Sequence, residues 1–177
     1  MTEAIARQDR GDVAVLLLDS PGRSRNVVDE ALLADLRRHV DAVAADDAIA
    51  AAVLASGKPG SFGVGADVAW LPQLAARPDA DAFLAGVHEL MLALVRSPKP
   101  YVAALDGPAL GGALELALAC HEIVATDAAT LGLPEVTLGL LPGGGGTQLL
   151  RRWVSGDDAL DLLLSGRSLG AAEAARR

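Results

Sequence analysis

The chain has 177 residues, 51% of them hydrophobic and 21% charged, with a formal net charge of −8. This length favours a single domain spanning residues 1–177, and the composition excludes a disordered chain. The acidic balance, without a long Lys/Arg cluster, argues against sustained nucleic-acid binding.

The N-terminal sequence MTEAIARQDRGD is polar and has no apolar core, so it does not predict a signal peptide. No apolar run approaches the ~20 residues that span a bilayer, so we expect no membrane association and a cytoplasmic protein. One cysteine, Cys120, excludes a disulfide framework and a cysteine-based zinc site. It lies in an apolar helical run and predicts a buried, unreactive thiol.

The first half of the chain predicts strands that alternate with helices. Val13 to Leu18 (VAVLLL) is a continuous apolar run typical of a buried strand. The following stretches predict, in order, an amphipathic helix over 28–44, a buried strand over 50–55 and a short helix over 68–74 after a glycine-rich turn.

The second half continues this alternation. A helix over 79–96 ends before two prolines. Next come a strand over 101–105, a helix from the Gly107 turn to about Cys120 and a short strand over 123–125. An irregular stretch with strand-like pieces over 131–141 follows, and then helices over 147–153 and 157–164. The pattern predicts α/β architecture with mainly parallel strands. The final residues, LGAAEAARR, resemble a helix that has just begun, so we expect a truncated chain.

Two glycine-rich turns each lie between a predicted strand and a predicted helix. They are Phe62–Val68 (FGVGADV) and Gly107–Glu115 (GPALGGALE). Such turns let backbone N–H groups approach a ligand, and two of them side by side would form an oxyanion hole. Taken singly, each is better explained as an ordinary strand–helix turn. Neither has the lysine of a phosphate-binding loop, and the Gly143–Gly146 run lacks it too.

Two carboxylates lie in apolar surroundings. Glu115 falls just inside a predicted helix among leucines and alanines, and Glu135 lies in the segment LGLPEV. A glutamate is rarely buried without a function or a partner. The alternatives are a helix N-terminal acid stabilised by the dipole for Glu115 and a solvated loop acid for Glu135.

Three stretches together resemble the enoyl-CoA hydratase/isomerase (crotonase) superfamily. They are SFGVGAD at 61–67, GPALGGALELA at 107–117, and LPEVTLGLLPG at 133–143 with GGTQ at 145–148. The resemblance follows the same order over nearly the whole chain, and 133–148 is especially similar to the hydratase part of multifunctional fatty-acid oxidation proteins. It implies a crotonase-like spiral of ββα units, apparently lacking the C-terminal helices of the family. It also implies a homotrimer or a dimer of trimers.

The resemblance also implies residue roles. The N–H groups of Ala66 and Gly112 would form the oxyanion hole, and Glu115 and Glu135 would be the catalytic carboxylates. The residues expected to contact CoA are Arg23, Asn26, Gly65, Asp67 and Val68. Coenzyme A would be part of the acyl-CoA thioester substrate, and no separate cofactor is expected.

This chain departs from the family pattern at two places. Ala113 stands where a third glycine is common, and Gly60 where a CoA-contacting lysine is common, with Lys58 as a possible substitute. The presence of both carboxylates favours an enoyl-CoA hydratase. The alternatives are another crotonase-type enzyme (isomerase, hydrolase or decarboxylase) and a non-catalytic acyl-CoA-binding or assembly subunit.

The remaining polar residues predict no further chemistry. His39, His88 and His121 are scattered without metal-ligand spacing, so no metal is expected. His39 and His88 lie on predicted surface helices and are interpreted as solvated. Trp70 and Trp153 are interpreted as packing residues.

Overall fold

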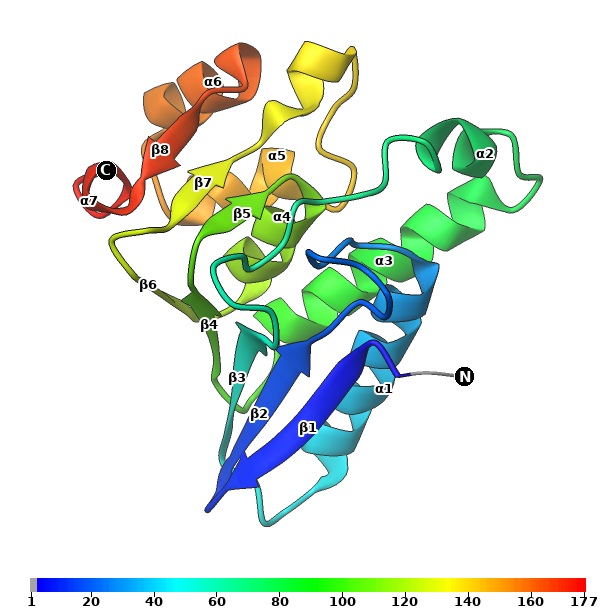
Figure 1. Cartoon of the computed structure of the whole chain (residues 1–177), viewed down its shortest axis with the longest axis vertical. Helices are drawn as coiled ribbons and strands as arrows, with labels where there is room; N and C mark the ends of the chain where they lie inside the picture. Colours follow the sequence, from blue (N-terminus) through cyan, green and yellow to red (C-terminus); the bar gives the residue numbers. More distant parts are fainter. Residues whose placement is uncertain (1–2) are drawn as a thin grey trace.

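The computed structural model describes residues 3–177 and contains two sheets and several helices (Figure 1). The larger sheet has the strand order β1-β2-β3-β4-β6. Its strands are β1 (Ile5–Arg10), β2 (Val13–Leu18), β3 (Ala51–Ser56), β4 (Tyr101–Leu105) and β6 (Glu122–Ala125). β1 pairs antiparallel with β2, and the other neighbours are parallel.

The smaller sheet has the order β5-β7-β8, formed by β5 (Pro108–Leu110), β7 (Thr130–Gly132) and β8 (Ser168–Gly170). β4 and β5 are consecutive in the chain but belong to different sheets, and Gly107 separates them. Gly107 has a φ of +80°, and a Cβ there would lie 2.1 Å from the carbonyl oxygen of Gly60. Only glycine fits this crossing point, because any side chain would overlap backbone.

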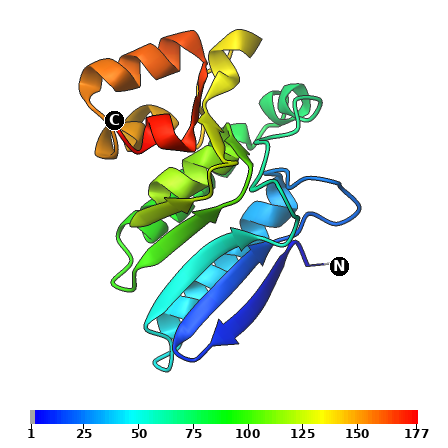
Figure 2. The ribbon, with the colours of Figure 1, turned by 60° about the vertical axis from the view of Figure 1, so that its left-hand side comes forward.

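Two long helices, α1 (Glu30–Ala45) and α3 (Ala80–Val95), lie along one face of the larger sheet (Figures 1 and 2). The other helices are α2 (Leu71–Ala75), α4 (Gly112–Ala119), η1 (Pro134–Leu138), α5 (Gly146–Leu149), η2 (Leu150–Arg152), α6 (Gly156–Ser165) and α7 (Ala171–Ala174). α1 begins where the Asp29 side chain accepts a hydrogen bond from the N–H of Leu32 at 3.0 Å, a standard N-cap. Unlike α1, helix α4 is buried along nearly its whole length. A helix buried on all sides needs no polar face, and α4 has none.

The buried side chains form one cluster that extends over both sheets. Alanine, leucine and valine dominate this cluster, and Tyr101 and Phe62 are its largest fully buried members. Cys120 belongs to it with 0% exposure, and burial raises the pKa of its thiol to about 12. The predicted buried, unreactive cysteine is therefore confirmed.

The predicted α/β fold is confirmed, and most predicted elements differ from the observed ones by one or two residues at each end. Three strands were missed: β1, β5 and β8. β1 (IARQDR) is an edge strand that is mostly exposed beyond Ile5, so it lacks an apolar run. β5 and β8 have three residues each, too short for a periodic signal. β7 overlaps the stretch that was expected to contain strand-like pieces.

The prediction for His39 is wrong. Its side chain is only 8% exposed, and Nε2 is buried without a hydrogen-bond partner among residues 3–177. The residue lies on the face of α1 that also buries Leu36 and Val40. Its spacing of three residues after Leu36 already places it on the apolar side.

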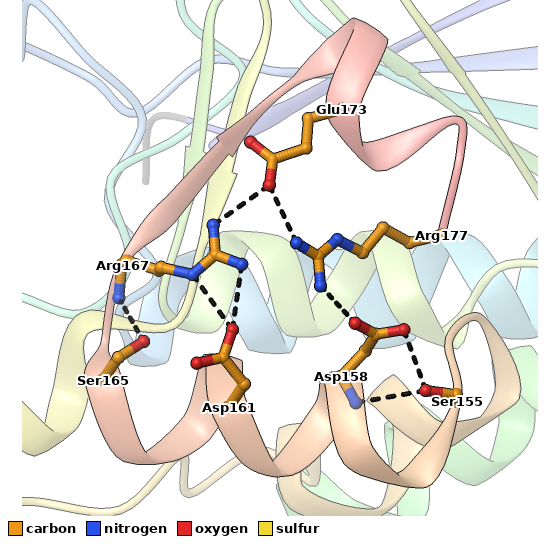
Figure 3. Close-up of polar contacts among 7 residues, drawn as sticks. All are labelled: Ser155, Asp158, Asp161, Ser165, Arg167, Glu173 and Arg177. Atoms are coloured by element: carbon orange, nitrogen blue, oxygen red, sulfur yellow. Dashed lines mark hydrogen bonds and ion pairs between the residues drawn. The ribbon is translucent and has the colours of Figure 1, made fainter.

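The C-terminal helix α7 is bound to α6 by ion pairs (Figure 3). Arg167 donates to Asp161 at 2.9 Å and to Glu173 at 3.1 Å. Arg177 pairs with Asp158 and, at 3.0 Å, with the same Glu173. A network of this kind fixes the orientation of α7 relative to α6 better than an isolated surface pair would.

Across residues 3–177, no helix combines the length and the apolar character needed to cross a membrane.

Candidate active site

The two glycine-rich turns meet at the end of the smaller sheet. Gly63 forms a parallel bridge with Ala109, and the N–H of Leu110 donates to the carbonyl oxygen of Gly63 at 3.0 Å. One step further along, a Cβ on Gly65 would lie only 3.2 Å from the amide nitrogen of Gly112. The backbones of the two turns are therefore in direct contact, as the oxyanion-hole prediction requires.

Two backbone N–H groups remain free at this contact. Among the residues that the structure describes, neither the N–H of Ala66 nor that of Gly112 donates a hydrogen bond. Gly112 is the first residue of α4, where helix geometry leaves N–H groups without an internal acceptor. The helix dipole adds partial positive charge at the same place. These two donors are suited to stabilise an oxyanion.

Asn26 fixes the shape of the first turn from inside the protein. Its side chain is 1% exposed and donates to Ser56 Oγ at 2.9 Å and to the carbonyl oxygen of Phe62 at 3.0 Å. Its Oδ1 accepts from the N–H of Ser20 at 3.0 Å, and its carbonyl accepts from Val64 at 3.0 Å. The polar atoms of its side chain are buried in internal hydrogen bonds, and a contact of this residue with CoA stays a prediction. Asn26 supports the turn that carries Ala66.

Glu115 lies on α4, one turn after the free N–H of Gly112, and is 3% exposed. Its Oε1 accepts a hydrogen bond from the N–H of Gly146 at 2.7 Å. Burial raises the pKa of Glu115, while the N–H groups of Gly146 and Gly144 act in the opposite direction by stabilising the carboxylate. The charged form is thus held by backbone donors inside an otherwise apolar site.

Glu135 approaches the same point from η1. The N–H of Gly111 donates to the carbonyl oxygen of Gly132 at 2.9 Å, which places the segment leading to Glu135 beside the second turn. A Cβ on Gly111 would lie 3.0 Å from Glu135 Oε1, and Oε2 is buried without a hydrogen-bond partner among residues 3–177. Burial, with a further contribution from the charge of Glu115, raises the pKa of Glu135 to about 7. This carboxyl group can hold a proton near neutral pH.

A cavity of about 220 Å³ joins these groups. Ala66, Gly112, Glu115 and Glu135 all line it, and its remaining wall is mainly apolar. Trp70 and Phe83 form part of that wall and contact each other edge to face, with ring centroids 5.6 Å apart. Val87 and Met91 of α3 line it as well. An apolar cavity with a few convergent polar groups is typical of a small-molecule site.

A larger cavity of about 490 Å³ lies between α4, α6 and α7. Its wall is largely aliphatic, and neither glutamate lines it. Size alone would favour this cavity. The smaller one is the better candidate, because it brings together free N–H donors and two carboxyl groups with raised pKa values.

The other residues expected at the CoA site lie around the first turn. Arg23 is exposed and donates to Asp67 at 3.1 Å, and Asp67 also accepts from the N–H of Ala69 at 3.0 Å. Val68 is 56% exposed and Gly65 is buried. The possible substitute lysine, Lys58, is paired with Asp19 at 2.6 Å. Arg23 and Val68 are thus accessible near the cavity, whereas Asp67 supports the local backbone.

Sequence reasoning missed the donors around Glu115. The N–H groups of Gly144, Gly145 and Gly146 all stabilise its carboxylate, and a Cβ on Gly144 would lie 2.8 Å from Glu115 Oε2. The run of four glycines at 143–146 was the available signal, but it was interpreted only as part of the family motif and as a run without the lysine of a phosphate-binding loop. His88 is exposed, as predicted, but its contact with this loop was not predicted.

Comparisons with known proteins agree with this geometry. The family model described as enoyl-CoA hydratase/isomerase matches residues 8–177. The fatty acid oxidation complex subunit alpha of Shewanella loihica is 45% identical over 170 residues, which are 95% of this chain and 24% of that protein. The corresponding subunit of Idiomarina loihiensis is 39% identical over 175 residues, which are 97% of this chain and 25% of that protein. The chain thus spans about a quarter of the length of these curated relatives.

Solved structures give the same family. An enoyl-CoA hydratase of Geobacillus kaustophilus superposes with a TM-score of 0.92 at 31% identity, covering 99% of this chain and 66% of that one. The enoyl-CoA hydratase of Bacillus anthracis superposes with a TM-score of 0.87 at 30% identity, and the match covers 98% of this chain and 67% of that one. The predicted crotonase-like fold is confirmed, and the chain belongs to the enoyl-CoA hydratase/isomerase family.

Proposed function

We propose that this protein is an enoyl-CoA hydratase, which adds water across the 2,3 double bond of a 2-enoyl-CoA. The observation that carries the proposal is the pair of carboxyl groups facing one cavity beside two free N–H donors. The two groups differ in environment: Glu115 accepts backbone hydrogen bonds, and Glu135 Oε2 has no partner among the described residues. This difference suits a base and an acid acting together.

In the proposed reaction, the thioester carbonyl oxygen accepts hydrogen bonds from Ala66 and Gly112. Glu115, as the carboxylate, takes a proton from water while the water oxygen bonds to the β-carbon. The electrons of the double bond move onto the carbonyl oxygen, and the resulting enolate is stabilised by the two N–H groups. Glu135, as the carboxylic acid, then gives its proton to the α-carbon. The product is a 3-hydroxyacyl-CoA, and a proton passing from Glu115 to Glu135 restores the starting state.

Fatty-acid oxidation is the pathway we propose, since the curated relatives are named fatty acid oxidation complex subunits. The reaction requires no cofactor beyond the CoA carried by the substrate. Assembly as a homotrimer or dimer of trimers, and a cytoplasmic location, stay predictions. The relatives are named as subunits of a complex, and this chain covers about a quarter of their length. Assembly of this chain into such a complex is therefore also a proposal.

The test is the loss of the conjugated-enoyl absorbance of crotonyl-CoA, with the 3-hydroxyacyl-CoA product identified by mass. Glu115→Gln and Glu135→Gln should each lose orders of magnitude in kcat. Conversion of a 3-enoyl-CoA without hydration would instead identify an isomerase. Binding of CoA without any turnover would identify a non-catalytic subunit, and full activity in both variants would refute the site assignment.

A further inference from the structure

His88 of α3 contacts the loop that holds Glu115. Its Nε2 lies 2.8 Å from the carbonyl oxygen of Gly143, a residue 55 positions further along the chain. A carbonyl oxygen only accepts hydrogen bonds, so Nε2 carries the proton and donates. The contact therefore exists in the neutral Nε2–H tautomer and in the imidazolium form alike.

The glycine loop, defined here as residues 142–146, turns around the Glu115 carboxylate. Gly146 donates to Glu115 Oε1 at 2.7 Å, and a Cβ on Gly144 would lie 2.8 Å from Oε2. A side chain at Gly144 would overlap the carboxylate, so only glycine lets the loop pass this close. Movement of the loop away from the carboxylate would lengthen the hydrogen bond from Gly146.

One face of α3 restrains this loop from outside. Met91 follows His88 by three residues, so the two side chains share a helix face. The Met91 methyl group lies 3.3 Å from the Cβ position at Gly144. Met91 and Gly144 both line the cavity. Within the part of the chain that the structure describes, His88 and the Glu115 carboxylate are the side chains that hydrogen-bond to residues 141–144, and His88 does so from outside the loop. Neighbouring Leu141 is 79% exposed and contributes little packing.

We propose that His88 is a positioning residue, whose hydrogen bond to Gly143 fixes the glycine loop so that its N–H groups point at Glu115. The proposal rests on the hydratase function proposed above. Loss of this bond would let the loop move away from the carboxylate and weaken the donors that hold its charged form. The thioester contacts of Ala66 and Gly112 would be unaffected, so kcat should fall while KM changes little. A positive charge on His88 would favour the ionised Glu115, as the intact hydrogen bond does.

The kinetic test compares His88→Ala with His88→Gln and with Glu89→Gln, an exposed neighbour on the same helix. His88→Ala should lower kcat for crotonyl-CoA about five- to tenfold, the range that one hydrogen bond supports. His88→Gln should recover most of this loss, because its terminal amide can reach the Nε2 position and donate. Glu89→Gln should match the wild type. Equal losses in His88→Ala and Glu89→Gln, or no recovery in His88→Gln, would overturn the proposal.

A second measurement does not depend on catalysis. Amide hydrogen exchange of Gly144 and Gly146, followed by NMR, should accelerate in His88→Ala and return toward the wild-type rate in His88→Gln. Unchanged exchange in His88→Ala would refute the positioning role. If the wild-type protein fails to hydrate crotonyl-CoA, the proposed function fails, and the exchange rates still decide whether His88 fixes the loop.

Discussion

Gly65 and Gly112 lie so close together that a methyl group on Gly65 would be 3.2 Å from the amide nitrogen of Gly112. The same methyl group would be 3.0 Å from the carbonyl oxygen of Leu110. Gly65 also has a φ of +83°, which side chains rarely adopt. The free N–H groups of Ala66 and Gly112, the proposed oxyanion donors, are therefore adjacent only because residue 65 has no side chain.

Gly65→Ala should displace one turn relative to the other and remove at least one donor from the oxyanion. We expect kcat/KM for crotonyl-CoA to fall by roughly 10²–10³, the cost of one lost oxyanion donor. Gly86→Ala is the matched control, because Gly86 lies on the exposed side of α3 with nothing within 4 Å of its Cβ position. Near-normal activity in Gly65→Ala would show that these N–H groups do not hold the thioester oxygen.

The pH dependence of kcat should follow Glu135. The proposed acid must be protonated, and its pKa is raised to about 7, so kcat should decline as the pH rises through about 7. An ordinary glutamate would already be ionised well below that pH. The measurement is kcat at saturating crotonyl-CoA on both sides of neutrality. A rate that stays constant through this range would contradict the assignment of Glu135 as the acid.

The raised pKa of Glu135 also predicts that the stability of the protein depends on pH. The folded protein binds the Glu135 proton more tightly than the unfolded chain does, so the free energy of unfolding should fall as the pH rises from 4.5 to about 7. Glu135→Gln stays neutral and should flatten that decline, which urea unfolding at several pH values would detect. Because the side chain is only half-buried, the effect should be modest. Parallel pH curves for wild type and variant would contradict it.

Gly144→Ala should disturb Glu115 without altering the carboxylate itself. Its Cβ would lie 2.8 Å from Oε2 and 3.1 Å from Cδ of Glu115, so the carboxylate or the glycine loop must shift. A displacement near 1 Å can cost as much as about 10²-fold in rate, and we expect kcat to fall at least tenfold within that range. The Gly86→Ala control applies here too. Unchanged kcat would show that the position of this carboxylate does not limit the reaction.

Asn26→Asp should destabilise the fold while almost preserving its shape. The change removes the donors to Ser56 and Phe62 and leaves a buried charge. We expect a loss of about 1–3 kcal/mol in the free energy of unfolding, measured with urea. Gln73→Glu makes the equivalent amide-to-carboxylate change on an exposed residue and should cost much less. Equal costs at the two sites would show that burial of Asn26 is unimportant.

The sequence predicted the strands of the larger sheet beyond β1 because each carries a continuous apolar run. It predicted the two turns because glycines followed those runs. Their contact could not be predicted from local pattern, since it depends on a bridge between Gly63 and Ala109. That contact was expected from the family resemblance.

Asn26 and His39 show what single-residue reasoning lacked. Both are polar, and both were placed at the surface or at a ligand, yet each is buried. The side chain of Asn26 makes its hydrogen bonds with partners up to 36 residues away in the chain, which a short stretch of sequence does not reveal. The donors around Glu115 were missed for the same reason, since Gly146 is 31 residues from it.

The aromatic pair at the cavity wall has a practical consequence. The chain contains two tryptophans, of which Trp70 lines the cavity against Phe83. The other, Trp153, donates from its indole nitrogen to the carbonyl oxygen of Leu118 at 3.0 Å and does not line that cavity. Replacing Trp153 with phenylalanine would leave one indole, whose emission should report directly when an acyl chain enters. The protein therefore carries its own optical probe for substrate binding, independent of turnover.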